Sequence, residues 1–148
     1  MGLFDKAFGK KDEGALKLNE REALSAVCVL AVAADGVIED AEVRRIITGL
    51  AEKKLFRGQR MEDLVRLLQD GAKNVQKRGA AAVIEAAKQA LSPELRETSF
   101  VMAADLVLAD GEVDDKEKKF LEDFQKALGI SDELALKIIE VVVMKNRG

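Results

Sequence analysis

The stretch Asp35-Gly36-Val37-Ile38-Glu39-Asp40-Ala41-Glu42 recurs later in the chain as Asp110-Gly111-Glu112-Val113-Asp114-Asp115-Lys116-Glu117. The first, second, sixth and eighth positions (Asp, Gly, Asp and Glu) are identical in the two copies. The Ile/Val and Glu/Asp positions are similar. A short apolar run precedes each copy, Val32-Ala33-Ala34 and Val107-Leu108-Ala109. One acidic turn is an ordinary connection between helices, but a duplicated one indicates an internal repeat and a possible paired-carboxylate site.

Outside these octets, apolar residues recur at the three- and four-residue spacing of α-helices, and no alternating strand pattern is present. The segment before each octet is apolar nearly all round, which predicts a buried helix, whereas the segment after it carries one apolar stripe. Asn19, Ser92-Pro93 and Ser131 can begin helices, and Gly129 can end one. We therefore predict an all-α fold of about seven helices, with two pseudo-symmetric helix–acidic turn–helix repeats in one domain.

The chain divides into a leader over residues 1–17 and a helical domain over residues 18–148. In the leader, Leu3, Phe4, Ala7 and Phe8 fall at helical spacing among lysines. A short helix that docks on the domain, a flexible end, and a weak contact with a membrane or partner are all compatible with this pattern. The domain is long enough to bury a core without disulfides or a structural metal.

Composition excludes several classes of function. There is no histidine, so histidine-based catalysis is impossible and zinc is not expected. Haem and nucleotides are not expected either, and no Gly-rich phosphate-binding loop is visible. The single cysteine, Cys28, lies among apolar residues, which favours a core position and a reducing, cytoplasmic location.

The charge and apolar patterns narrow the class of partner. The net charge is −3 and the basic residues are dispersed, which does not favour binding to nucleic acid. No apolar stretch approaches the roughly 20 residues of a membrane span, so the chain is not predicted to be transmembrane.

The octets have a structural explanation and a functional one. Gly36 and Gly111 can take the positive φ that redirects the chain, and Ile38 and Val113 can anchor the turns against the core. Acids at the start of the following helix can cap it, as the spacing of Asp114 and Glu117 indicates.

Capping leaves part of the pattern unexplained. Glu42 and Glu117 are in phase with the core-facing stripes of their helices, where a carboxylate is costly unless it is partnered. If the repeats pack symmetrically, the acids of both turns converge and need a cation or raised pKa values.

The octet also coincides with the second half of an EF-hand calcium loop. The first half fails, because Ala31, Ala33, Leu106 and Leu108 stand where that loop needs oxygen ligands. A self-contained EF-hand is therefore excluded. Any metal would be calcium, magnesium or manganese, with ligands pooled from the two turns.

At these residues the chain resembles the tellurite-resistance TerB family. The resemblance covers nearly the whole chain, including the opening Met-Gly-Leu-Phe-Asp-Lys, both Asp-Gly turns and the stretch 114–117. It implies an all-α cytoplasmic protein of the response to tellurite and other toxic insults. The implied partners are other stress-response proteins, in some cases at the inner membrane surface. The implied metal ligands are the acids of the two turns: Asp35, Glu39, Glu42, Asp110, Asp114 and Glu117.

Two functions remain open at this stage. The first is a module that binds a divalent cation through those six carboxylates. The alternative is a non-catalytic helical interaction scaffold, whose acidic turns are structural caps or recognise a basic partner. An enzyme is not predicted, because no nucleophile is paired with a base and no substrate-pocket signature is present.

Overall fold

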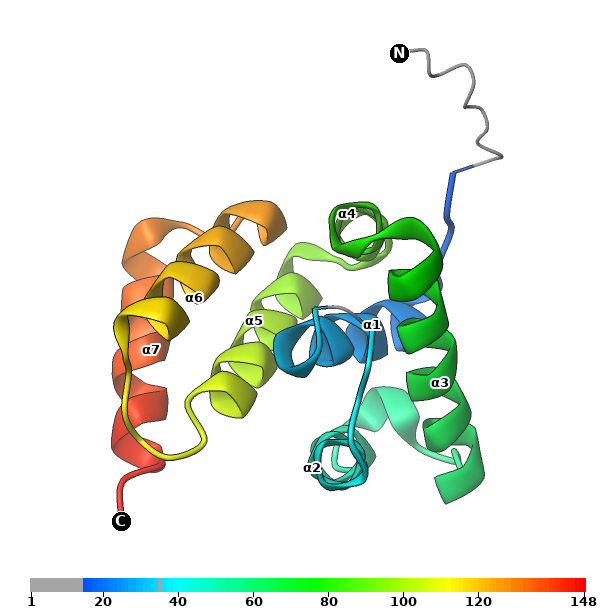
Figure 1. Ribbon diagram of the computed structural model, residues 1–148, viewed down its shortest axis with the longest axis horizontal. Coiled ribbons are helices and arrows are strands. Elements are labelled where there is room, and N and C mark those ends of the chain that lie inside the picture. Colours follow the sequence, from blue (N-terminus) through cyan, green and yellow to red (C-terminus); the bar gives the residue numbers. More distant parts are fainter. Residues whose placement is uncertain (1–14, 35) are drawn as a thin grey trace.

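The computed structural model describes residues 15–34 and 36–148, and every structural statement below concerns these residues. They form seven α-helices and one short 3₁₀ helix, η1, with no β-strand in this part of the chain (Figure 1). The all-α prediction is confirmed. The elements, in chain order, are α1 Glu20–Val32, α2 Asp40–Ala51, η1 Lys54–Phe56, α3 Met61–Arg78, α4 Ala80–Ala90, α5 Pro93–Val107, α6 Asp115–Leu128 and α7 Asp132–Lys145.

Helix α1 lies at the centre of the molecule, as Figure 1 shows. Its residues from Ala23 to Leu30 are all buried, as the all-round apolar pattern predicts. Helices α2, α3, α4 and α5 pack around it. Helices α6 and α7 form an outer layer on the far side of α5, with α6 also in contact with α4.

The helix ends follow the capping signals in the sequence. The Asn19 side chain accepts a hydrogen bond from the Glu22 amide at 2.8 Å, and the Asn19 amide donates to the Glu22 carboxylate. Ser92 caps α5 with Pro93 at its first position, and Ser131 caps α7. Gly129 ends α6 in the left-handed conformation. The signals at Asn19, Ser92, Gly129 and Ser131 thus coincide with observed helix ends.

The order helix, acidic turn, helix, helix occurs twice, once as α1–α2–α3 and again as α5–α6–α7, with α4 between them. In each copy an amide side chain from the third helix or its end closes the turn. Gln76 Nε2 donates to the Gly36 carbonyl at 2.8 Å, and Asn146 Nδ2 donates to the Leu108 carbonyl at 3.0 Å. The pseudo-twofold relation itself stays a prediction, because α1 is enclosed whereas α5 is partly open to solvent.

Two expectations about buried residues were wrong. Val113 does not anchor its turn against the core but is 40% exposed, although the corresponding Ile38 is half-buried. Val101, in the apolar run of α5, is also 40% exposed. Val113 borders a groove beside α7, and Val101 borders one with residues of α2 and α7, but neither side chain is fully covered. Apolar periodicity cannot show how completely a neighbouring helix covers a side chain.

The glycine of the second turn is packed directly against the end of α7. Gly111 has φ +77°, and a Cβ there would lie 2.6 Å from the Asn146 carbonyl oxygen. Gly58 has a similar φ of +86°, but nothing lies within 4 Å of the corresponding Cβ. Alanine at position 58 therefore tests backbone strain alone, whereas alanine at position 111 adds a steric conflict.

We expect Gly58→Ala to cost about 1–2 kcal/mol of unfolding free energy, the price of a left-handed alanine. Gly111→Ala should cost at least about 1 kcal/mol more, because Asn146 must move and its hydrogen bonds, each worth roughly 0.5–1.5 kcal/mol, are weakened. Urea denaturation of both variants measures the difference. Equal losses would show that the turn and α7 are not locked together.

Candidate functional site between the acidic turns

A cleft of about 420 Å³ lies between the two acidic turns. Its floor comes from the carboxyl ends of α1 and α5, and its sides come from the first turns of α2 and α6. Most of the lining is apolar, and the polar side chains are concentrated on α2 and α6. The lining residues are Leu30, Ala31, Val32, Ala34, Glu42, Arg45, Leu106, Val107, Lys116, Glu117 and Phe120.

The structure brings together Glu42 and Glu117, the two acids that the sequence places in phase with the core. Both are half-buried and both line the cleft. Glu42 Oε1 accepts a hydrogen bond from the Glu39 amide at 3.0 Å, and Glu117 Oε1 accepts one from the Asp114 amide at 3.2 Å. Each carboxylate thus caps its own helix through one oxygen. Because an ionised carboxylate has about four acceptor sites, capping leaves each of them with capacity for a ligand.

The other acids of the turns are used locally. Asp114 Oδ1 caps α6 by accepting from the Glu117 amide at 2.8 Å, and Asp110 Oδ1 accepts from the Glu112 amide at 3.0 Å. Glu39 precedes α2 at its N-cap and is exposed. None of these three lines the cleft. Asp35 lies outside the described residues.

No group of three or more Cys, Asp or Glu side chains in the described part of the chain is arranged to hold a metal ion. The described donors facing the cleft are two carboxylates, whereas calcium takes six to eight oxygen ligands and magnesium takes six. The described residues alone therefore do not fit a divalent cation. Whether the six-carboxylate set forms a site depends on Asp35 and stays a prediction.

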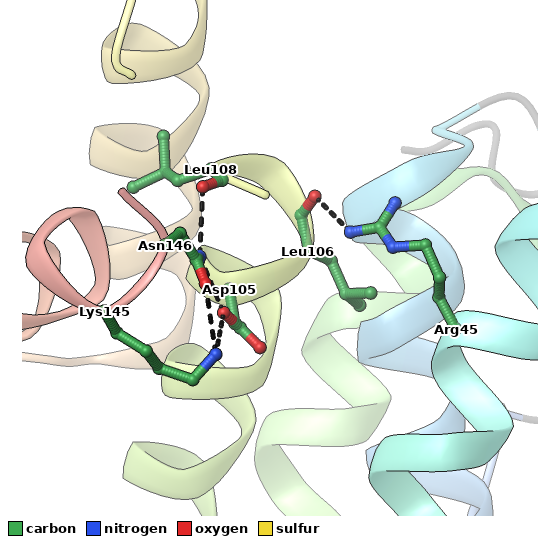
Figure 2. Close-up of polar contacts among 6 residues, drawn as sticks. All are labelled: Arg45, Asp105, Leu106, Leu108, Lys145 and Asn146. Atoms are coloured by element: carbon green, nitrogen blue, oxygen red, sulfur yellow. Dashed lines mark hydrogen bonds and ion pairs between the residues drawn. The ribbon is translucent and has the colours of Figure 1, made fainter. Parts of the chain in front are cut away.

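Two basic residues that sequence analysis overlooked also line this cleft. Arg45 lies one turn after Glu42 on α2, and Lys116 immediately precedes Glu117 on α6. Arg45 Nη2 donates to the Leu106 carbonyl at the end of α5, at 2.9 Å (Figure 2). This bond satisfies one of the free carbonyls at a helix carboxyl end, where positive charge is favourable. The spacing of Glu42 and Arg45 was the signal that could have indicated a mixed-charge site.

Among the described residues, none of these four charged side chains forms an ion pair with another side chain. The cleft therefore presents two acids and two bases above an apolar floor, with their charges not cancelled by close contact. Such a surface fits a ligand that carries both apolar groups and charge. It is less suited to a bare cation, which two neighbouring positive charges repel.

A second polar cluster joins α7 to α5, the helix whose carboxyl end forms part of the cleft floor. Figure 2 shows this cluster together with Arg45. Asp105 Oδ1 accepts from Asn146 Nδ2 at 2.8 Å and from Lys145 Nζ at 3.0 Å. Burial raises the pKa of the Asp105 carboxyl, but the hydrogen bonds from Asn146 and Lys145, with the charges of Lys145 and Arg45, outweigh burial and hold the pKa below its usual range. Asp105 therefore bonds the end of the neighbouring helix α7.

The single thiol takes no part in this site. Cys28 is fully buried in α1, and desolvation raises its pKa to about 12 although the Lys53 charge acts in the opposite direction. It is therefore protonated at neutral pH, and the prediction of a core cysteine is confirmed.

Comparison with known proteins identifies the family. A family model described as Tellurite resistance protein TerB matches residues 21–138, a span that contains both acidic turns. The chain belongs to the TerB family. No curated protein and no solved structure matches it. In this TerB-family chain none of the described helices has the length and apolar character needed to cross a membrane.

The contribution of the Asp105 interactions with Lys145 and Asn146 to stability can be tested through its pH dependence. Because its folded-state pKa is lowered, the charged form stabilises the fold above the ordinary carboxyl pKa of about 3.9, and this contribution is lost as pH falls through the lowered value. After allowance for solvent screening of this partly exposed pair, Asp105→Asn should lose about 0.5–1 kcal/mol at pH 7. The gap from the unsubstituted protein should narrow below pH ~4.

Urea denaturation at several pH values measures this gap. The matched control is Asp123→Asn, which removes an exposed ion pair with Lys119 within α6 and joins no two helices. A difference between Asp105→Asn and the unsubstituted protein that is independent of pH would contradict the assignment.

Proposed function

We propose that the protein is a cytoplasmic, non-catalytic interaction module of the tellurite stress response. In this proposal the cleft between the acidic turns binds a segment of another stress-response protein, one that carries basic and acidic side chains among apolar ones. Membership of the TerB family supports the link to tellurite resistance. The observation that carries the proposal is the cleft itself, in which Glu42, Arg45, Lys116 and Glu117 surround an apolar floor.

The shape and chemistry of the cleft support a peptide rather than a small ion. Its volume of about 420 Å³ is in the range of clefts that hold several side chains or a small molecule. Phe120, half-buried and stacked on Phe124 with ring centroids 5.2 Å apart, offers an aromatic surface at one side. Aromatic residues and unpaired charges of this kind are typical anchors for a protein partner.

The first test removes three of the four charges of the cleft, leaving Arg45, and keeps the caps. In the triple variant Glu42→Gln, Glu117→Gln and Lys116→Gln, each Gln at a capping position can still accept the backbone amide. Charged hydrogen bonds contribute roughly 1.5–3 kcal/mol each, so partner affinity should fall about tenfold or more for each one lost. We expect cells that depend on this variant to survive tellurite poorly, while its melting temperature stays close to that of the parent.

The matched control makes the same three changes on exposed residues outside the cleft: Glu94→Gln, Glu122→Gln and Lys73→Gln. A photo-crosslinking residue placed at position 116 should capture the partner, whereas one at position 73 on α3 should not. Full tellurite survival of the cleft variant, with unchanged crosslinking, would contradict the proposal.

A second function is favoured by one specific observation: Glu42 and Glu117, from corresponding positions of the two turns, line the same cleft. We propose it as the alternative: Glu42 and Glu117, together with Asp35 and the other acids of the turns, bind calcium, magnesium or manganese. Such a cation would neutralise the paired carboxylates and tie the two turns to each other.

Thermal denaturation with each cation tests this alternative. A ligand that binds only the native state at one hundred times its Kd stabilises it by about 2.7 kcal/mol, so a genuine site gives a clear rise in melting temperature at millimolar cation. The rise should disappear in the Glu42→Gln, Glu117→Gln double variant and persist in the Glu94→Gln, Glu122→Gln control. No rise with any of the three cations would exclude the alternative and leave the interaction module unaffected.

A further inference from the structure

Helix α7 is an outer helix that packs chiefly against α5 and leaves much apolar surface in contact with solvent. Only Ala135 and Val142 are buried among its residues. Leu136 is 59% exposed and Met144 57%, and Val113, from the second acidic turn beside the helix, is 40% exposed. Exposed apolar side chains that gather in one place, rather than singly, mark interaction surfaces.

These side chains border a groove of about 590 Å³ between α7 and the second acidic turn. The groove is lined by Val113, Ile139, Glu140, Val143, Met144 and Arg147. Leu136, Ile139 and Val143 follow one another at spacings of three and four residues, so they form a line along one side of α7. We call this line, together with Val113 and Met144, the α7 stripe.

The two ends of the α7 stripe carry opposite charges. Asp132 and Glu133 lie at the start of α7, and Arg147 lies just beyond its end, all three exposed. A helix with an acidic start, an apolar middle and a basic end is complementary to a copy of itself running in the opposite direction. Antiparallel helices also place each positive amino end beside a negative carboxyl end.

We propose that the α7 stripe binds a second copy of this chain, in a twofold-symmetric dimer with antiparallel α7 helices. With the axis between Ile139 and Glu140, Leu136 faces the partner's Val143. Asp132 and Glu133 then lie near the partner's Arg147, and Ile139 lies beside the partner's Glu140 at the centre. Each contact occurs twice, as a closed twofold interface requires.

The charge pattern is what selects a second copy over a different protein. An unrelated partner would need a surface of reversed polarity, whereas this chain already supplies one through the symmetry operation. Helix α7 has 14 residues and is therefore about 21 Å long. One helix and one turn from each copy make an interface below the usual size of a stable dimer. The dissociation constant of the dimer should therefore be roughly micromolar.

Sedimentation of the full-length protein over a concentration series up to about 1 mM tests the dimer. We expect concentration-dependent dimerisation that is weakened at least tenfold by Leu136→Glu with Met144→Glu. The control pair, Val37→Glu with Met61→Glu, changes the same number of exposed apolar residues outside α7 and should leave dimerisation unchanged, since Val37 is 64% and Met61 65% exposed. A protein that stays monomeric throughout, or loses its dimer equally in both pairs, overturns the proposal.

Two further variants test the antiparallel arrangement. Arg147→Glu should weaken the dimer, and adding Glu133→Arg to the same chain should restore it at least in part, which a merely hydrophobic association would not do. Glu140→Cys, close to the axis, should form a disulfide between copies on oxidation, whereas Lys137→Cys should not. Cys28 does not interfere, because it is fully buried. No rescue combined with no crosslink at position 140 overturns the arrangement.

Discussion

The complete burial of α1 is the constraint on which the other helices depend. Residues Ala23 to Leu30 have almost no exposed surface, so neighbours must cover every side of the helix. Fully burying a side chain such as Leu24 or Val27 contributes about 1.5–3 kcal/mol, and only a packed arrangement of several helices provides that burial. Helices α2, α3, α4 and α5 supply it. The position of the candidate site follows, because α1 and α5 both end at the cleft and their acidic turns emerge on either side of it.

How much the sequence could predict depended on whether the signal was local. Asn19, Ser92 and Ser131 cap helices through their own side chains, so their roles are visible without knowledge of the fold. That Glu42 and Glu117 line one cleft agrees with the sequence, in which each glutamate is in phase with an apolar stripe and the turns are duplicated. Exposure of Val101 and Val113 was not predictable, since it depends on how completely neighbouring helices cover each side chain. Asp35, central to the original metal hypothesis, lies outside the described residues.

The acidic turns show how one residue type can serve two purposes at the same position. Capping accounts fully for Asp114 and for one oxygen of Glu117, and it needs no ligand. It does not account for the position of Glu42 and Glu117 along one cleft with Arg45 and Lys116. The Asn19 box on α1 also has a half-buried glutamate, Glu22, so the burial of Glu42 and Glu117 is ordinary for a capping box in this chain. The charges that face the cleft are therefore the part of the motif that local structure leaves unexplained.

The second acidic turn also links the cleft to the surface of α7. Glu117 lines the cleft from the first turn of α6, whereas Val113, four residues earlier, borders the groove beside α7. Two residues before Val113, Gly111 lies against the Asn146 backbone. The Asn146 side chain in turn donates hydrogen bonds to Asp105 and to the Leu108 carbonyl at the end of α5. These contacts join α5, the second turn and the end of α7. Asp105 immediately precedes Leu106, which lines the cleft, so the same contacts also support the cleft. The cleft and the groove beside α7 thus depend on one shared set of polar contacts. A side chain larger than that of glycine at position 111 would collide with the Asn146 backbone and disturb both surfaces.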